Sequence, residues 1–197
     1  IRDSRITSME RLNKEWYEVT FDGDLSQLAV GDLITRTCYP EVLIRNCRMG
    51  NNRARGLLLG SRKKTVVEDC YFHTPGAAIL FEGDGYYWYE QAGVRDVVIR
   101  GNVFENGNYG SPGWGSACIA VGSGIPDRET SRYHRNIRVE GNTFRVFDPR
   151  IVNLYCVDGF VFTRDNAIEY IDDYSDLSGK KRNFIIRNCD NIVIEKE

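Results

Sequence analysis

The stretch Val97-Val98-Ile99-Arg100-Gly101-Asn102 decides the fold, because its pattern recurs along the chain. Each copy is a run of β-branched or aromatic residues, followed by a charged residue, then Asn, Asp or Gly, and finally Cys or Asn. Five further copies have this form: Val42–Cys47, Val66–Cys70, Ile137–Asn142, Phe160–Asn166 and Phe184–Cys189. Self-similarity of this kind predicts one structural unit that is used repeatedly.

The spacing of the copies indicates what that unit is. Measured at the final Cys or Asn, successive copies lie 23, 32, 40, 24 and 23 residues apart. The shortest unit cannot hold two strands and a crossover helix, and no segment shows sustained helical periodicity. It fits one coil of a right-handed parallel β-helix, in which coils stack at about 4.8 Å. We therefore predict an all-β solenoid, with the final Cys or Asn stacked as an inward ladder at a tight bend of each coil.

A second β-rich segment follows most copies and is expected to stack as another sheet. These segments are Gly56–Gly60, Ala77–Gly83, Ala117–Gly122 and Ile151–Cys156. The two longest units exceed the shortest one by 9 and 17 residues. Long loops on a repeat protein commonly project from one face and carry its function. The extended loops are therefore where a functional site is expected.

The first part of the chain departs from the repeat. Trp16–Phe21 alternates like an exposed strand, and Val30–Ile34 reads as a turn into another strand. We expect residues 1–39 to hold a partial coil with a small β excursion. Residues 40–197 are expected to form the coils, as part of a longer β-helix.

Composition excludes several classes of function. The formal net charge is −2, and Lys and Arg are scattered rather than clustered, which argues against a nucleic-acid partner. No apolar run reaches the roughly 18 to 20 residues of a membrane helix. The chain starts at Ile1 without a charged and apolar leader, so we expect a fragment or a processed product.

The six cysteines, Cys38, Cys47, Cys70, Cys118, Cys156 and Cys189, include no CxxC pair and no His at metal-ligand spacing. We predict no metal and no cofactor. Because the repeat places three of them in its core, buried free thiols are favoured over a disulfide framework. The two histidines have no Ser or Cys partner in a hydrolase pattern, and no phosphate-binding loop is present.

Acidic and aromatic residues gather where the segment at 77–83 ends. Glu82 and Asp84 share one face of an extended strand, with backbones roughly 7 Å apart. Paired carboxylates about 6.5 to 9.5 Å apart are typical of inverting glycosidases, which need room for a water molecule. Trp88 is expected to stack on a sugar ring, with Glu90 beside it. A solvated turn with edge-covering aromatics is the equally weighted alternative.

The next loops have the same character. Glu105–Gly115 offers Glu105 as a further acid and Tyr109 and Trp114 for stacking, and the loop after residue 122 offers Asp127. Arg55 and Arg62, in the preceding coil, are candidates for binding an anionic or hydroxylated ligand. Surface charge is the commoner role for such residues.

The runs Arg55–Leu59, Ala78–Asp84, Trp88–Glu90 with Gly93, and Val94–Phe104 together resemble glycoside hydrolase family 110. The resemblance spans roughly residues 40–145. It implies a secreted or periplasmic, right-handed β-helical exo-α-1,3-galactosidase that acts by inversion without a metal. Asp84 matches the acidic turn of that family, whereas Gly83 stands where a second Asp is expected and Glu82 is the candidate replacement.

The resemblance implies a carbohydrate partner that ends in galactose, and no nucleic acid or membrane. Asp84 is then expected to activate water, while Glu82, Glu105 or Asp127 protonates the leaving oxygen. Two alternatives stay open. One is a non-catalytic glycan-binding β-helix such as a tailspike or adhesin stalk, and the other is a polysaccharide lyase.

Overall fold

The structure is a computed structural model in which two compact units are recognised, Ile1–Cys38 and Tyr39–Glu197. It describes residues 4–32, 34–35, 37–85, 88–89, 92–125, 127–171 and 182–195, and of Asp84 the backbone alone. Within these ranges, no helix has both the length and the apolar character needed to cross a bilayer.

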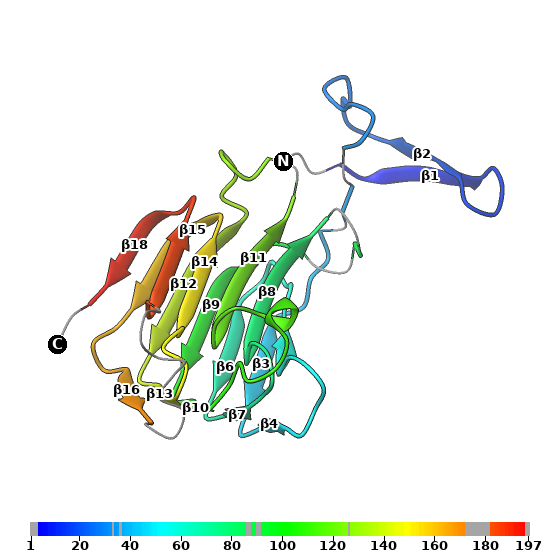
Figure 1. Cartoon of the computed structure of the whole chain (residues 1–197). Coiled ribbons are helices and arrows are strands. Elements are labelled where there is room, and N and C mark those ends of the chain that lie inside the picture. Colours follow the sequence, from blue (N-terminus) through cyan, green and yellow to red (C-terminus); the bar gives the residue numbers. More distant parts are fainter. Residues whose placement is uncertain are drawn as a thin grey trace. The chain divides into compact units, whose positions relative to one another are not determined.

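The first unit is built on a two-stranded antiparallel hairpin, drawn in blue in Figure 1. Its strands are β1 (Ile6–Arg11) and β2 (Tyr17–Phe21). Asn13 Oδ1 accepts the backbone N–H groups of Glu15 and Trp16, at 2.9 and 3.0 Å, and so fixes the turn. The alternation at Trp16–Phe21 thus marks a real strand. The strand expected after Val30 is absent from the described residues of that segment.

The second unit consists of three parallel sheets and one 3₁₀ turn, η1 (Pro112–Trp114). The first sheet holds β3 (Val42–Arg45), β6 (Thr65–Glu68), β9 (Arg95–Arg100), β12 (His134–Glu140), β15 (Val157–Phe162) and β18 (Asp190–Ile194). The second sheet holds β4 (Arg48–Gly50), β7 (Tyr71–His73), β10 (Val103–Glu105), β13 (Thr143–Val146) and β16 (Ala167–Tyr170). The third sheet holds β5 (Leu57–Leu58), β8 (Ile79–Asp84), β11 (Ile119–Gly124), β14 (Val152–Tyr155) and β17 (Phe184–Arg187).

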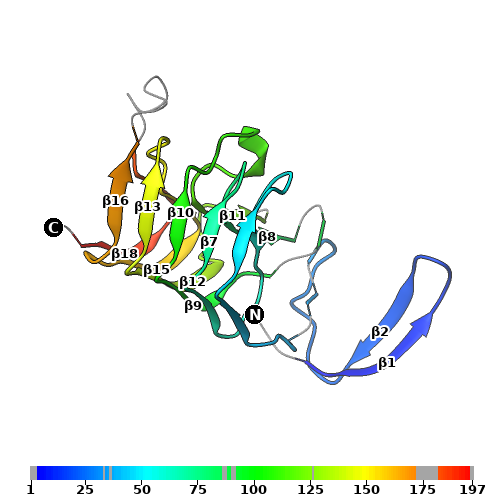
Figure 2. The same ribbon diagram turned by 90° about the horizontal axis from the view of Figure 1, so that it is seen from below.

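The chain visits the three sheets in turn, so that each visit adds one strand beside the previous one in every sheet. We call one passage through the first, second and third sheets a circuit. Figure 1 shows the strands of the first and third sheets, and Figure 2 shows those of the second sheet in the order β16, β13, β10 and β7. The molecule is all-β with parallel sheets, as the repeat predicts.

The corner between the first and second sheets contains the predicted ladder. Asn102 donates from Nδ2 to Asn142 Oδ1 at 2.9 Å, and Asn142 donates in the same way to Asn166 at 2.9 Å. The backbone N–H of Cys70 donates to Asn102 Oδ1, and that of Cys47 donates to Cys70 Sγ. Each bond joins neighbouring circuits, so the column of these five residues is confirmed.

The left-handed backbone at this corner belongs to the residue before the ladder position. Asn46, Asp69, Gly101 and Gly141 have φ values of 54°, 52°, 62° and 59°. Asn, Asp and Gly tolerate this conformation best, which explains why the repeat carries them there. The ladder side chain follows and turns inward.

Cys189 does not belong to the column. The segment Phe184–Arg187 is β17 of the third sheet, paired with β14, and not a strand of the first sheet. Cys189 therefore lies at the corner between the third and first sheets, where the preceding Asn188 and Cys156 have φ values of 50° and 59°. The sequence pattern is similar at both corners, because each corner needs a residue with a left-handed backbone conformation.

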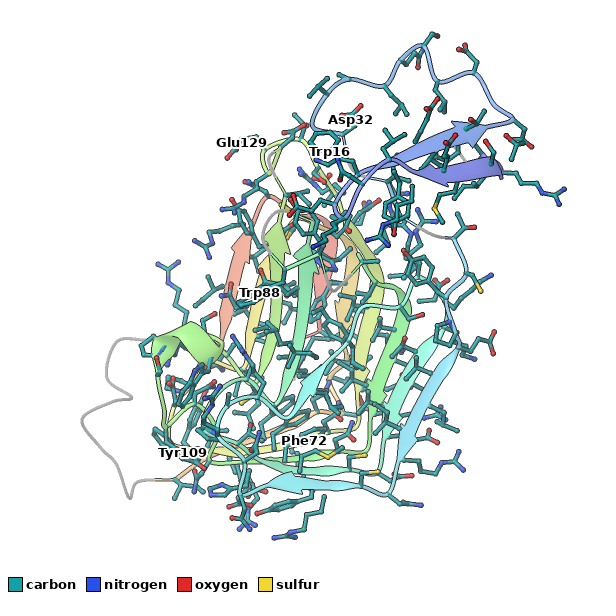
Figure 3. The ribbon with its side chains drawn as sticks, turned by 90° about the vertical axis from the view of Figure 1, so that its right-hand side faces the viewer. Trp16, Asp32, Phe72, Trp88, Tyr109 and Glu129 are labelled. Atoms are coloured by element: carbon teal, nitrogen blue, oxygen red, sulfur yellow. The ribbon has the colours of Figure 1, made fainter. Side chains whose placement is uncertain are left out.

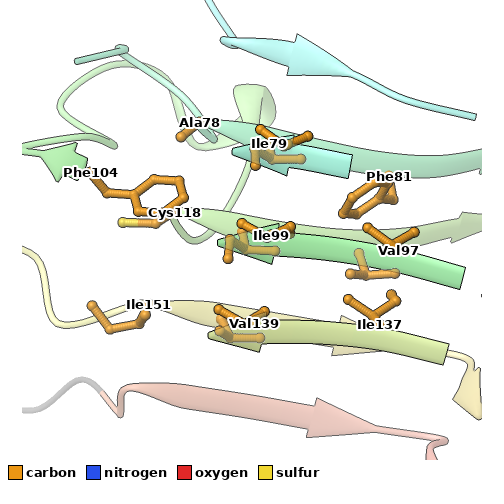
Figure 4. Packing of buried hydrophobic residues seen from close by; sticks show 14 of the residues in the cluster. Ala78, Ile79, Phe81, Val97, Ile99, Phe104, Cys118, Ile137, Val139 and Ile151 are labelled. Carbon is orange, nitrogen blue, oxygen red and sulfur yellow. The ribbon is translucent and has the colours of Figure 1, made fainter. Parts of the chain in front are cut away.

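The core fills the space between the sheets with stacked side chains of like kind. Phe72, Phe104 and Phe144 stack along the second sheet, with ring centroids 5.2 and 4.7 Å apart. Ile79 and Ile99 face this interior from the third and first sheets (Figure 4). Each fully buried side chain of this size contributes about 1.5 to 3 kcal/mol of transfer free energy. The outer faces of the sheets are thereby left for other roles.

Candidate active site

A cavity of about 210 Å³ lies on the outer face of the third sheet. Its floor includes Leu80 and Ala120, which are register partners on β8 and β11 and belong to a small apolar cluster separate from the main core. Side chains alternate along a strand, so the next outward positions are Glu82 on β8 and Gly122 on β11, also register partners. The cavity exists because β11 presents only Ala and Gly between bulkier neighbours.

The same outward position continues across two more strands. The register of β11 with β14 runs to Val121 and Leu154, so the positions that follow are Gly122 and Tyr155, and Tyr155 is the partner of Arg187 on β17. One row across the sheet therefore reads Glu82, Gly122, Tyr155 and Arg187, and all four line the cavity. The row thus presents a carboxylate, a glycine without a side chain, an aromatic ring and a guanidinium. Successive members are separated by the strand spacing of about 4.8 Å.

Glu82 is half-buried and leans over its glycine partner. A Cβ atom at residue 122 would lie 2.6 Å from Glu82 Oε2 and 2.9 Å from Oε1. The carboxylate thus occupies the space left by the missing side chain. Gly83, on the opposite face, is covered in a similar way, because a Cβ atom there would lie 2.1 Å from a ring carbon of Tyr133. A carboxylate at position 83 has no room beside that ring.

The loop that carries η1 forms the wall on the other side of the cavity. Arg55 donates from an Nη2 nitrogen to the carbonyl oxygen of Gly113 at 2.9 Å, and the amide of Asn153 donates to the hydroxyl of Ser116. Pro112, Gly113, Gly115 and Ser116 all line the cavity. Within the described part of the chain, Asn153 Oδ1 and Arg55 Nε are buried without a hydrogen-bond partner.

His134 supports the floor of the cavity from inside. Its Nε2 lies 2.6 Å from the carbonyl oxygen of Gly122, and its Nδ1 lies 3.3 Å from the backbone N–H of Val94. These partners require a neutral ring that donates from Nε2 and accepts at Nδ1. Burial lowers the pKa of His134 to about 4, which keeps the ring neutral at physiological pH. His134 therefore fixes the backbone beneath Glu82.

Among the predicted site residues, the structure brings Glu82 and Arg55 to this cavity, beside the loop of Trp114. Trp114 itself packs its ring against Gly110, where a Cβ atom would lie 2.9 Å from the ring. Glu105 lies on β10 in the second sheet, ion-paired with Arg145 at 3.3 Å, and Tyr109 lies beside the ring of His73. The structure does not bring Glu105 and Tyr109 to the cavity.

Two further predicted residues follow the strands without lining the cavity. Asp127 is exposed in the loop after β11, and hydrogen bonds from the hydroxyl and N–H of Thr130 lower the pKa of its carboxyl group. Arg62 is half-buried near Tyr133 and His134, and its charge contributes to lowering the pKa of that histidine. The lowered pKa of Asp127 favours its ionised form, which suits a base better than a proton donor.

The remaining predicted residues follow the end of β8. The backbone of Asp84 lies in β8, in register with Gly124. Trp88 is 67% exposed and lies well away from Tyr109 (Figure 3). Glu90 lies outside the described residues. In the described part of the chain, no three His, Cys, Asp or Glu side chains gather as metal ligands.

Five residues that line the cavity are not identified from the sequence alone: Tyr155, Arg187, Asn153, Ser116 and Gly122. Tyr155 and Gly122 stand in two of the β-rich segments that follow copies of the repeat. Each lies the same number of residues after the buried positions at which the two strands pair. Aligning those segments by register is the signal that would have placed them beside Glu82. The sequence pattern groups Arg187 with the strands of the first sheet, whereas it lies in the third. An alignment of the third-sheet segments therefore leaves it out.

The chain is similar in sequence to several curated proteins named alpha-1,3-galactosidase. Alpha-1,3-galactosidase A of Bacteroides fragilis is 36% identical over 195 residues, covering 96% of this chain and 32% of the relative. Alpha-1,3-galactosidase B of Bacteroides thetaiotaomicron is 34% identical over 98% of this chain and 32% of the relative. This chain is a homologue of the α-1,3-galactosidases. Alpha-1,3-galactosidase B of Akkermansia muciniphila is 34% identical over 86% of the chain and 22% of its own length.

The resemblance found in the sequence to exo-α-1,3-galactosidases is thereby confirmed, and these relatives are glycoside hydrolases. The chain spans about a third of the length of the first of these curated relatives. No family model matches the chain.

Proposed function

We propose that this chain forms the sugar-binding part of a glycoside hydrolase that removes terminal α-1,3-linked galactose. The observation that carries the proposal is the half-buried carboxylate of Glu82, which lies over Gly122 at the edge of a cavity that Tyr155 also lines. Similarity to α-1,3-galactosidases over nearly the whole chain supports galactose as the sugar.

The reaction that we propose is hydrolysis with inversion. The oxocarbenium-like transition state needs one carboxyl group to protonate the leaving oxygen and a second to activate water on the opposite face of the ring. Glu82 is assigned the proton-donor role, because its neighbour Gly122 leaves room for the carboxylate to reach the cavity. Asp84 is assigned the water-activating role, on the resemblance to family 110.

The complete fold that we propose is a right-handed parallel β-helix that continues the circuits seen here. Support comes from the constant order in which the chain visits the three sheets and from the ladder that joins circuit to circuit. We also propose a periplasmic or extracellular location, because glycans that end in galactose are met outside the cytoplasm.

The test is an assay of the complete enzyme with a panel of oligosaccharides that end in α-1,3-, α-1,4- or α-1,6-linked galactose or in α-N-acetylgalactosamine. Release of galactose from the α-1,3-linked members alone is expected, and NMR should detect β-galactose as the first product. Binding of the same sugars without release contradicts the enzyme and supports a glycan-binding module. A product that absorbs in the ultraviolet indicates a lyase instead.

A further inference from the structure

We propose that Arg187 and Arg128 form an anion-binding subsite at the end of the cavity opposite Glu82. The ligand is a sulfate ester or a carboxylate on the sugar next to the terminal galactose. The identity of that galactose rests on the proposed function, whereas the anion subsite rests on the geometry of the two arginines.

Both guanidinium groups lie against one aromatic ring. The Cζ atom of Arg187 lies 5.2 Å from the centroid of the Tyr155 ring, and that of Arg128 lies 6.0 Å from it. An arginine that rests on a ring uses the face of its guanidinium and keeps its N–H donors at the edge. Those edge donors match the paired oxygens of a carboxylate or sulfate.

The N–H groups of Arg187 and Arg128 donate few hydrogen bonds to the described residues of the protein. Among the described residues, the side chain of Arg187 donates no hydrogen bond, and Arg128 donates only from Nε, to the carbonyl oxygen of Ile125 at 3.2 Å. Neither arginine forms an ion pair with a described carboxylate. Ion pairs instead hold six other arginines: Arg45, Arg100, Arg132, Arg138, Arg145 and Arg150.

Two positive charges on one ring repel each other, and a bound anion removes that repulsion. Arg55 adds a third guanidinium to the lining of the same cavity, where it donates to the backbone carbonyl oxygen of Gly113. Along the row, the carboxylate of Glu82 therefore lies at one end and the guanidinium group of Arg187 at the other.

The distance along the row suits a ligand longer than one sugar. Glu82 and Arg187 lie in the same row on β8 and β17, three strand spacings apart, which is about 14 Å. A galactose placed in the cavity beside the carboxylate of Glu82 leaves the neighbouring sugar over Tyr155 and Arg187. The anionic group is thus expected on the sugar that follows the cleaved linkage.

The test uses three disaccharide probes with α-1,3-linked terminal galactose. The second sugar is neutral in one probe, carries a sulfate ester in another and is a uronic acid in the third. Sulfur replaces the linking oxygen, so that the probes resist hydrolysis and calorimetry measures binding alone. The proteins are the unchanged chain, Arg187→Gln and Arg48→Gln. Arg48 is a matched control, because it rests on the ring of Tyr71, at 3.9 Å, in the second sheet.

We expect the unchanged chain to bind at least one anionic probe about tenfold more tightly than the neutral one. Arg187→Gln should abolish that preference, and Arg48→Gln should keep it. A preference for the sulfate probe alone identifies a sulfate ester, and one for the uronic acid alone identifies a carboxylate. Equal binding of all three probes by the unchanged chain overturns the proposal.

The same experiment separates this inference from the proposed function. Oxygen-linked forms of the three probes report hydrolysis. If the complete enzyme releases galactose from none of them, while an anionic probe is still preferred and Arg187→Gln removes the preference, the proposed hydrolysis fails and the anion subsite stands. If galactose is released but charge makes no difference, only the subsite fails.

Discussion

The carboxylate of Glu82 occupies the space that a side chain at Gly122 would need. The two residues are register partners on adjacent strands, so the glycine sets where the carboxylate can lie. A catalytic acid must be held close to its productive position, because a misplacement of about 1 Å can lower the rate about a hundredfold. Gly122 is therefore expected to act as a positioning residue.

Gly122→Ala tests this relationship. The added methyl group meets only the end of the Glu82 side chain, which can swing away, so the melting temperature should change little. We expect kcat on an α-1,3-galactoside to fall by about tenfold or more while KM changes less. Gly107→Ala, whose added methyl group would lie 3.5 Å from the nearest atom, is the control and should retain full activity. An unchanged kcat in Gly122→Ala contradicts the role assigned to Glu82.

Asp84→Asn tests the proposed base. The substitution removes a proton acceptor and preserves the size of the side chain, so turnover should fall by about a hundredfold or more with the folded state intact. The assay requires the complete enzyme, because the chain spans about a third of its relatives. Full activity with normal melting would remove Asp84 from the mechanism.

Asn142→Leu tests the ladder. Asn142 is 1% exposed, accepts bonds from Asn102 and donates to Asn166 and to the carbonyl oxygen of Ile99. A leucine leaves these buried partners unsatisfied, so the free energy of unfolding should fall by about 3 kcal/mol. Urea denaturation measures this directly. A loss below about 1 kcal/mol would mean that water replaces the amide.

His134 makes stability depend on pH. Its pKa of about 4 in the folded protein lies below the ordinary value of 6.5, so protonation favours the unfolded chain. The contribution of the neutral ring is complete above about pH 6.5 and is lost as the pH falls to 4. Over that interval the unfolding free energy should fall by about 3 kcal/mol more in the unchanged chain than in His134→Gln. Parallel pH dependences in the two proteins would contradict a depressed pKa.

The sequence predicts the parts of the fold that repeat with strong hydrophobic runs. The first and third sheets are recognised from such runs, and the ladder from Cys70 to Asn166 follows from their spacing. The strands of the second sheet, such as β7 (Tyr71–His73), have three or four residues, which is too short for a visible alternation. Phe184–Cys189 is misplaced because two different corners need the same left-handed residue.

The candidate site is only partly visible in the sequence, for a geometric reason. Glu82 and Arg55 stand out by their residue types, but Tyr155 becomes a neighbour only through the register of β8, β11 and β14. Loops of different lengths separate these strands. The sequence separation of two residues therefore does not show whether they share a row. Glu105 stands in a promising loop and yet belongs to another sheet, where it pairs with Arg145.

Alternation in the third sheet divides its residues into two independent sets. Inward residues such as Phe81 and Leu154 are buried and hold the circuits together, whereas the outward row from Glu82 to Arg187 lines the candidate cavity. An exchange of Tyr155 or Arg187 therefore alters the chemistry offered to a sugar without opening a void in the core. Related enzymes can then diversify toward different glycans by changing single outward residues, and each such change starts from an already folded scaffold.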